Sequence, residues 1–427
     1  IDLPKDILFE EGPYFTLENK RPCAYKPQLM EDHQQIEKAV KLLADAEQPI
    51  IYGGGGLINS GTRASELLRE FADLTGYPVT LTLMGLGAFP ASNKHFLGML
   101  GMHGTYEANL AMHQCDVMLN IGARFDDRVT GRIKDFSPNS TKIHVDIDPS
   151  SINKNVKVDL PIIGDAALIL EQMIQIWKEK GYKRKDRMLS EWWKKIEVWR
   201  DKKCLDFKQD SKIIKPQYAI RRLFEKTQKT DAYITTEVGQ HQMWAAQYYG
   251  FDQPNRWMTS GGLGTMGYGL PAAMGVQIAH PDALVIDIAG EASILMNIQE
   301  LSTISQYNLP VKAFIVNNQW MGMVRQWQEL NHGSRYSQSY TESLPDFVKL
   351  ADSFGGTGMV AETVDQLDSV IDAMLETEGF FLADIRVAKE ENCFPMIPSG
   401  AAHNEMILGL GDSLESPTTT KAGMALV

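Results

Sequence analysis

Short apolar segments alternate with segments of helical periodicity along most of this 427-residue chain. The apolar segments have the length of strands, and between them apolar residues recur every three or four positions. This alternation is typical of parallel β-sheets covered by helices, because neighbouring parallel strands need a crossover connection. The predicted strands are residues 49–52, 78–83, 116–121, 142–147, 232–235, 284–288 and 311–316. The sequence therefore predicts an α/β protein, with helices at residues 34–46, 64–74, 218–224 and 297–306.

A charged segment divides this alternation into two parts. Residues 179–213 carry many lysines, arginines and acidic residues, with three tryptophans among them. We interpret this segment as an exposed linker that contains one helix packing across a surface, since a basic run is usually a solvated face. The sequence therefore predicts two doubly wound parallel-sheet domains, at residues 29–178 and 214–400, followed by a tail at residues 401–427. The proline-containing residues 1–28 are predicted to be a linker from an N-terminal domain that this sequence does not include.

Composition and charge argue against several classes of partner. The net charge is −12, and no run of like charge is long enough to suggest a tail that binds nucleic acid. The longest apolar runs fall far short of the roughly 18 residues that a membrane helix needs. The four cysteines are widely separated, without zinc spacing or the density of a disulfide framework. With no secretory signal recognised, these features predict a protein of the reducing cytoplasm that binds neither nucleic acid nor membrane.

Polar residues follow two of the predicted strands in a pattern suited to a metal ion. Gly290 and Glu291 come after the strand at residues 284–288, and Asn318, 27 positions after Glu291, follows the strand at residues 311–316. Loops beyond the carboxyl ends of neighbouring parallel strands share one crevice, so the two side chains are expected to meet there. A carboxylate and an amide oxygen are hard ligands of the kind that Mg²⁺ binds, and they leave room for a diphosphate to complete the shell.

The predicted helix that follows this glycine is suited to the diphosphate itself. The glycine lets the backbone approach closely, and the amides of Ala292 and Ser293 can face an anion at the helix N-terminus. The segment resembles the signature of the thiamine-diphosphate enzyme family, Gly-Asp-Gly followed at about this distance by two asparagines. The resemblance places Glu291, Asn318 and Trp320 at the metal. Because Glu291 stands where the family has an aspartate, weaker magnesium binding is predicted.

Two further segments fit the same cofactor. Gly239, Gln240 and His241 follow a predicted strand, and the matching residues of the family contact the diphosphate. Taken alone, His241 would more often be structural than functional. In the glycine-rich residues 261–271, Met266 matches the large apolar residue that props the cofactor in a bent shape. The resemblance therefore implies contacts with thiamine diphosphate at Gly239, Gln240, His241, Met266, Gly290, Ala292 and Ser293.

The same glycine-rich stretch also satisfies the formula for a different cofactor. Gly262, Gly264 and Gly267, with Asp287 twenty positions further on, have the spacing of a dinucleotide-binding loop. That motif requires a strand directly before it, and residues 256–260 are too short and turn-rich to predict one. A nicotinamide-dependent dehydrogenase is therefore the weakest of the functional alternatives.

The segment directly after the second asparagine narrows the family further. Residues 321–328 closely resemble the acetohydroxyacid synthases, in which the tryptophan matching Trp327 shapes a pocket that favours 2-oxobutanoate as second substrate. Taken alone, the segment could be an ordinary amphipathic helix with a buried tryptophan. The resemblance implies a substrate pocket formed by Met323, Val324 and Trp327.

Segments of the first predicted domain resemble the FAD-binding segments of the same family. They are residues 103–109, 122–131 and 146–149, and the glycines at 53–56 suit close approach of a cofactor. The arginines among them could otherwise form surface salt bridges. The implied FAD contacts are Gly54, Gly55, His103, Gly104, Arg124, Asp126, Arg128, Asp146 and Asp165. In this family the FAD takes no net redox part, and residues 394–400 match a segment that covers the active site.

The resemblance implies a transferase with thiamine diphosphate, Mg²⁺ and FAD as cofactors. It would decarboxylate pyruvate and join the two-carbon unit to pyruvate or 2-oxobutanoate. The products, 2-acetolactate or 2-aceto-2-hydroxybutanoate, are precursors of valine, leucine and isoleucine. In the family, the activating glutamate lies on a pyrimidine-binding domain that is outside this sequence. No catalytic residue is therefore assigned, and these residues alone are predicted to be inactive.

The same resemblance implies an assembly, and two other functions stay open. The expected partners are 2-oxo acids, further catalytic subunits in a homodimer or homotetramer, and a regulatory small subunit. Another thiamine-diphosphate lyase, such as a glyoxylate carboligase, would share the FAD and the metal motif, and substrate profiling would separate the two. A cofactor-binding module without activity is the other alternative, which restoring the missing domain would test.

Overall fold

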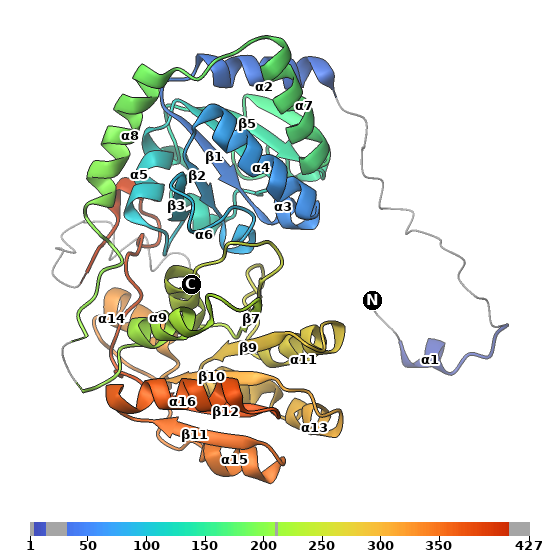
Figure 1. Cartoon of the computed structure of the whole chain (residues 1–427), viewed down its shortest axis with the longest axis vertical. Coiled ribbons are helices and arrows are strands. Elements are labelled where there is room, and N and C mark those ends of the chain that lie inside the picture. The colour runs from blue at the N-terminus through green and yellow to red at the C-terminus, as the bar shows by residue number, and fades with distance from the viewer. Residues whose placement is uncertain (1–3, 14–31, 210–211, 410–427) are drawn as a thin grey trace.

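Two parallel β-sheets with helices on their faces make up the chain (Figure 1). The computed structural model describes residues 4–13, 32–209 and 212–409. Within residues 4–13 lies the short helix α1 (Lys5–Leu8), whereas most of the predicted N-terminal linker and the tail beyond residue 409 lie outside the described residues. The predicted fold class, α/β with parallel sheets, is confirmed.

The first sheet has the order β3-β2-β1-β4-β5-β6, and all of its strand pairs are parallel. Its strands are β1 (Pro49–Gly53), β2 (Val79–Leu81), β3 (Phe96–Met99), β4 (Val117–Ile121), β5 (Thr141–Asp146) and β6 (Leu160–Ile163). Its helices are α2 (His33–Asp45), α3 (Gly55–Asn59), α4 (Thr62–Thr75), α5 (Tyr106–Gln114), α6 (Asp127–Thr130) and α7 (Ala166–Glu179). The strand order reverses between β1 and β4, and ligands of such sheets commonly bind beyond the carboxyl ends of the strands at this point.

The second sheet has the order β11-β12-β10-β9-β7-β8 and is also parallel throughout. Its strands are β7 (Ala232–Thr236), β8 (Trp257–Thr259), β9 (Leu284–Ala289), β10 (Lys312–Asn317), β11 (Thr357–Ala361) and β12 (Phe381–Arg386). Its helices are α9 (Pro216–Thr227), α10 (Gln240–Tyr248), α11 (Gly269–Ala279), α12 (Glu291–Ile294), α13 (Glu300–Gln306), α14 (Gly322–Asn331), α15 (Phe347–Ser353) and α16 (Val364–Glu376). Here the order reverses between β7 and β9, so a second crevice is expected beside these two strands.

All seven predicted strands form, with ends that shift by one or two residues. The strands β9 and β10 are almost completely buried, and buried parallel strands of this kind are continuous apolar runs. The prediction that residues 256–260 form no strand is wrong, because β8 lies there and pairs with β7. This strand is only three residues long, and its tryptophan is buried. A strand so short carries too little periodicity to be read from sequence.

The charged segment at residues 179–213 is less exposed than predicted. It contains helix α8 (Asp186–Arg200), which packs along the first sheet and its helices (Figure 1). Trp192 is buried, and its indole nitrogen donates a hydrogen bond to the Pro49 carbonyl over 3.0 Å. Trp193 donates in the same way to the Gly76 carbonyl over 2.9 Å. The tryptophans therefore fix the helix to the domain, while its charged residues face solvent.

A segment near the C-terminus, residues 390–405, runs from the second sheet to the first and appears in red in Figure 1. The Ile397 amide donates to the Met102 carbonyl over 2.8 Å, and His403 Nε2 lies 2.6 Å from the Val129 carbonyl. The side chains of Ile397 and His403 are both buried. The segment is therefore part of the packing between the two sheets. Among the described residues, no helix has the length and apolar character needed to cross a membrane.

The burial of His403 predicts a loss of stability in acid. Burial lowers the pKa of His403 to about 4, so in the folded protein it stays neutral at a pH where the unfolded chain, with an ordinary pKa near 6.5, takes up a proton. The contribution of His403 is fully present above pH 6.5 and is lost as pH falls towards 4. The free energy of unfolding should fall by up to about 1.4 kcal/mol per pH unit through this group.

Urea unfolding of the wild-type chain and of His403→Gln across this pH range tests the expectation. Glutamine keeps a side-chain amide that can donate to the Val129 carbonyl, but it does not titrate. The difference in unfolding free energy between the two proteins should shrink as the solution is acidified. Two pH profiles that run parallel would show that His403 is not a source of acid lability.

Candidate functional site

The proposed metal ligands leave the second sheet from neighbouring strands. Strand β9 ends at Ala289, which pairs with Ile315 of the parallel strand β10. Both strands therefore end at the same edge of the sheet. Glu291 begins helix α12 directly after β9, and Asn318 follows β10 by one residue. Both side chains are buried, at 1% and 4% exposure. The expectation that these two loops share one crevice is therefore met by the geometry.

One pocket at this edge is lined by all of the residues assigned to thiamine diphosphate and to the metal. It is bounded by the loops after β7, β9 and β10 and by the start of helix α14. The assigned residues that line it are Gly239, Gln240, His241, Met266, Gly290, Glu291, Ala292, Ser293, Asn318, Trp320, Met323 and Val324. Segments from four separate parts of the sequence thus meet around a single space.

The Glu291 carboxylate in this pocket suits a divalent cation. Burial raises the pKa of Glu291 to about 7, and Thr341 Oγ1 donates to its Oε1 over 3.3 Å. A bound cation would favour the charged carboxylate and offset this cost of burial. In the described parts of the chain, no three His, Cys, Asp or Glu side chains gather as a metal site. A magnesium ion here would therefore depend on phosphate oxygens and water for most of its shell.

His241 gives a second, independent indication that a ligand belongs in this pocket. Its imidazole is buried, its Nε2 atom has no hydrogen-bond partner, and burial lowers the pKa of His241 to about 3. A buried polar atom without a partner costs free energy unless something else binds it. Space is also tight around the ring, because a methyl group on Gly290 would lie 2.7 Å from Nδ1. The residues present therefore fit a polar ligand such as a diphosphate.

The three residues assigned to the substrate line a second cavity, and two of them, Met323 and Val324, also line the first pocket. This second cavity, of about 520 Å³, is lined by Met323, Val324, Trp327, Gln328, His332 and Arg335. Met323 and Val324 line both pockets, since they lie in the first turn of α14. The two cavities are therefore adjacent.

The residues assigned to FAD lie along the carboxyl edge of the first sheet, and some of them are closely packed whereas others are exposed. Gly54 and Gly55 follow β1, where a methyl group on Gly54 would lie 2.3 Å from the Gly122 carbonyl oxygen, so this glycine is needed for contact between two loops. Arg124 is exposed and pairs with Asp126 over 2.7 Å. Arg124 thus forms a surface salt bridge, as the alternative interpretation expected. Its exposure also leaves it accessible to a phosphate.

Other residues of this set already have partners. Asp146 ends β5 and accepts from the Asp148 amide over 2.9 Å, and Asp165 caps helix α7 by accepting from the amides of Ala167 and Leu168. His103 is buried with Nδ1 3.2 Å from the Pro395 carbonyl. Gly104 is packed so closely that a methyl group would lie 2.4 Å from the Met99 carbonyl oxygen. These contacts give each residue a structural role beside the one assigned to it.

Two family models match the chain in its two sheets. Residues 36–173 match the central domain of thiamine pyrophosphate enzymes, and residues 237–385 match the C-terminal TPP binding domain of the same enzymes. The second match includes Gly239, His241, Glu291 and Asn318, and it contains the whole of the first pocket.

Three similar proteins indicate which group of these enzymes the chain resembles. The acetolactate synthase large subunit of Haemophilus influenzae is 47% identical over 411 residues, which are 96% of this chain and 71% of that protein. The corresponding protein of Buchnera aphidicola subsp. Schizaphis graminum is 48% identical over 413 residues, with the same coverage. The acetolactate synthase isozyme 3 large subunit of Escherichia coli is 46% identical over 413 residues, again 96% of this chain and 71% of its own length.

The chain belongs to the acetolactate synthase large-subunit family.

In this acetolactate synthase family member, a residue assigned to FAD lies beside Trp327. The guanidinium carbon of Arg128, from helix α6 of the first sheet, lies 5.7 Å from the centroid of the Trp327 ring. Its Nη1 atom is 3.6 Å from Met102 Sδ. The structure therefore places a positive charge beside the tryptophan, at the junction of the two sheets.

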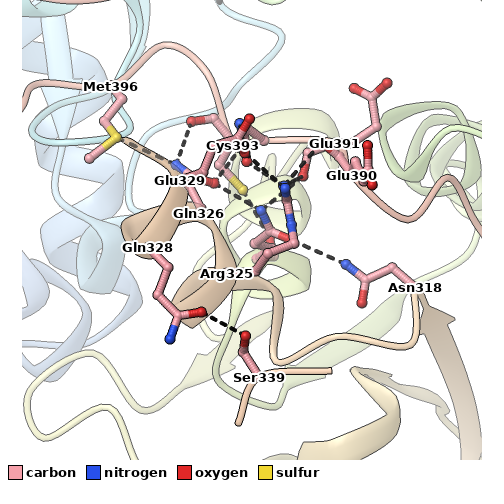
Figure 2. A network of polar contacts seen from close by, with 12 residues as sticks. Asn318, Arg325, Gln326, Gln328, Glu329, Ser339, Glu390, Glu391, Cys393 and Met396 are labelled. Carbon is pink, nitrogen blue, oxygen red and sulfur yellow. Dashed lines mark hydrogen bonds and ion pairs between the residues drawn. The ribbon is translucent and has the colours of Figure 1, made fainter. Parts of the chain in front are cut away.

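Several polar residues that support this pocket could not be predicted from the sequence. Glu237 is buried beneath the loop that carries Met266, and its carboxylate accepts from the amides of Gly267 and Leu270 over 2.5 and 3.1 Å. Arg325 and Gln326 are buried on α14 and bind the segment at residues 390–393 (Figure 2). A charged or amide residue in an amphipathic helix is ordinarily predicted to be exposed, so no pattern pointed to them.

Proposed function

We propose that this chain forms the cofactor and substrate site of an acetohydroxyacid synthase. The reaction joins the two-carbon unit of pyruvate, after loss of CO₂, to pyruvate or 2-oxobutanoate, giving 2-acetolactate or 2-aceto-2-hydroxybutanoate. One observation carries the proposal: the loops after β7, β9 and β10 line a pocket that shares Met323 and Val324 with the cavity of Trp327. The membership of the acetolactate synthase family supports the same reaction.

Each part of the pocket has a distinct task in this proposal. When bound, thiamine diphosphate supplies the electron sink that stabilises the negative charge left by the departing CO₂. Glu291 and Asn318 would hold the magnesium ion, and the amides at the start of α12 would face the diphosphate. His241, which is neutral because of its burial, can share a hydrogen bond with a phosphate oxygen through its unpartnered Nε2. Met266 would support the cofactor ring from the pocket wall.

The second substrate would bind in the cavity lined by Trp327. Met323, Val324 and the indole ring provide apolar contact for the short alkyl group of 2-oxobutanoate. The Arg128 guanidinium beside the ring offers a positive charge for the substrate carboxylate. We assign no general base here, because Glu291 is the one glutamate lining either pocket among the described residues and it faces the metal position. The activating glutamate, like a partner subunit, is proposed to come from outside these residues.

Product analysis of the holoenzyme tests the function. Pyruvate with 2-oxobutanoate should yield 2-aceto-2-hydroxybutanoate and 2-acetolactate, with the first favoured. Formation of a semialdehyde from glyoxylate instead would support a glyoxylate carboligase. Cofactor binding without any product, in a sample that includes every domain of the enzyme, would leave a binding module as the better description.

We expect the first sheet to bind FAD. Purified or reconstituted protein should show flavin absorbance, and binding should quench the flavin fluorescence. Arg124→Ala removes an exposed cation and should weaken binding, whereas Lys94→Ala, at a surface residue outside the assigned set, should not. A folded sample that neither absorbs nor quenches would remove the flavin from this account.

Replacing Glu291 with aspartate should tighten magnesium-dependent binding of thiamine diphosphate by about 10-fold, or about 1.4 kcal/mol. Glutamate reaches one carbon further, while Asn318 is fixed by burial and by its hydrogen bonds. Mg²⁺ prefers tight octahedral geometry and tolerates this misfit less well than Ca²⁺ does. Titrating the cofactor into both proteins at a fixed Mg²⁺ concentration measures the difference. Equal affinities would mean that the neighbouring backbone adapts and that the glutamate serves as well.

A further inference from the structure

We propose that Gln326 and Gln240 are positioning residues that hold the Asn318 amide with its oxygen towards the metal. The inference rests on the proposed function, in which Asn318 is a magnesium ligand. Gln326 belongs to helix α14, and Gln240 begins helix α10, so neither is adjacent to Asn318 in sequence. Both glutamine side chains are buried, at 0% and 3% exposure. Each of them therefore needs its hydrogen bonds satisfied inside the protein.

The first link joins Gln326 to the segment near the C-terminus. The backbone amide of Cys393 donates to Gln326 Oε1 over 2.8 Å, and Gln326 Nε2 donates to the Cys393 carbonyl over 3.3 Å (Figure 2). A backbone N–H can only donate and a carbonyl can only accept, so this pair fixes which end of the Gln326 amide is oxygen. The side chain cannot flip without losing both bonds.

The second link fixes the orientation of the Gln240 side-chain amide. Its Nε2 donates to Gln326 Oε1 over 2.8 Å and to the Glu391 carbonyl over 2.9 Å. Because both partners are acceptors, the opposite end of this amide must be its oxygen. Gln240 Oε1 then accepts from Asn318 Nδ2 over 3.2 Å. The nitrogen of Asn318 is thereby turned towards Gln240 and away from the metal position.

The third link leaves the Asn318 oxygen available. Asn318 Oδ1 accepts from the Trp320 amide over 3.1 Å and keeps a further lone pair for a cation. An inverted amide would present N–H groups to the metal, which repel it. Partners behind a ligand that fix its orientation are worth roughly 10–100-fold in metal affinity in known sites. Both glutamines therefore act on the metal through Asn318, without touching it.

The packing around Gln240 gives this network an independent probe. A methyl group on Gly322 would lie 2.0 Å from Gln240 Oε1 and 2.9 Å from Asn318 Nδ2. The glycine lies in the first turn of α14, where its backbone would accept alanine. Gly322→Ala would displace the Gln240 amide and leave every hydrogen-bonding side chain of the network in the sequence.

The test is the magnesium affinity of the full chain in the presence of thiamine diphosphate, measured by calorimetry with MgCl₂ as the titrant. Gln326→Met, which has a similar shape but no amide, should bind Mg²⁺ about 10-fold more weakly. Gln326→Glu retains the acceptor for both donors and should stay within about 3-fold of wild type. Gly322→Ala should show a loss similar to that of Gln326→Met. In Gln326→Met, hydrogen exchange of the Cys393 amide should also become faster.

A matched control separates positioning from general destabilisation. Gln277 is another buried glutamine, and it donates to the His280, Pro281 and Ala283 carbonyls at the opposite end of the sheet. Gln277→Met should lower the melting temperature but keep the magnesium affinity. Wild-type magnesium affinity in Gln326→Met and Gly322→Ala would overturn the inference, as would equal losses in Gln326→Glu and Gln326→Met. A wild-type chain that binds no Mg²⁺ would instead refute the proposed function.

Discussion

Replacing Arg325 with methionine should destabilise the protein by about 3–5 kcal/mol, because it breaks a buried ion pair and leaves its partners inside the protein. The guanidinium is 1% exposed, and its Nη1 atom lies 2.8 Å from Glu329 Oε2. Its Nη2 atom donates to the Glu390 and Glu391 carbonyls over 3.0 and 3.1 Å (Figure 2). The substitution would leave these carbonyls and a partly buried carboxylate without the guanidinium as a hydrogen-bond donor.

Unfolding by guanidinium chloride measures the loss, and Arg63→Met is the matched control. Arg63 also makes ion pairs, with Glu66 and Glu171, but its side chain is 57% exposed. Such surface pairs are worth about 0–1 kcal/mol, so this variant should unfold close to wild type. A loss below about 1 kcal/mol in Arg325→Met would show that the network does not brace the segment at residues 390–393.

Replacing Trp327 with leucine should remove much of the preference for 2-oxobutanoate over pyruvate as second substrate. The expected change is on the order of 1–3 kcal/mol, which is the range for one methylene in an apolar pocket. The indole ring lies in the wall of the cavity proposed for the second substrate, and the Arg128 guanidinium lies 5.7 Å from its centroid. Leucine would widen the cavity and weaken contact with the extra methylene of 2-oxobutanoate.

A competition assay with both acceptors, read as the ratio of the two products in the holoenzyme, measures this effect. Trp199→Leu is the control, since Trp199 packs against Trp192 on helix α8, away from either pocket. It should change stability and leave the product ratio as in wild type. If the ratio is the same in Trp327→Leu and wild type, this tryptophan does not determine specificity.

The position of the site could be predicted from sequence because it depends on strand ends. Glu291 and Asn318 each follow an uninterrupted apolar run, and the topology of parallel sheets brings such ends to one edge. His241 could be placed in the same way, after the run that forms β7. The resemblance added the chemical meaning, since a lone carboxylate and a lone amide do not by themselves specify a metal.

The supporting contacts could not be predicted, because they join residues far apart in the chain through single hydrogen bonds. Gln326 and Cys393 are 67 positions apart, and nothing in their local sequence indicates the contact. Arg325 lies in an amphipathic segment where a charged residue is expected to face solvent, yet it is buried. The residues predicted to cover the active site, at 394–400, include Met396 and Ile397, which are packed inside the protein.

The most direct test of the whole account is a calorimetric titration of thiamine diphosphate into the full chain, with Mg²⁺ present and with a chelator present. We expect saturable binding of one cofactor per chain with Mg²⁺ and a large loss of affinity with the chelator. In the Glu291→Ala, Asn318→Ala double variant, Mg²⁺ should no longer strengthen binding, because both protein ligands are gone. The same affinity with and without the metal, or an unchanged response to Mg²⁺ in the double variant, would contradict the account.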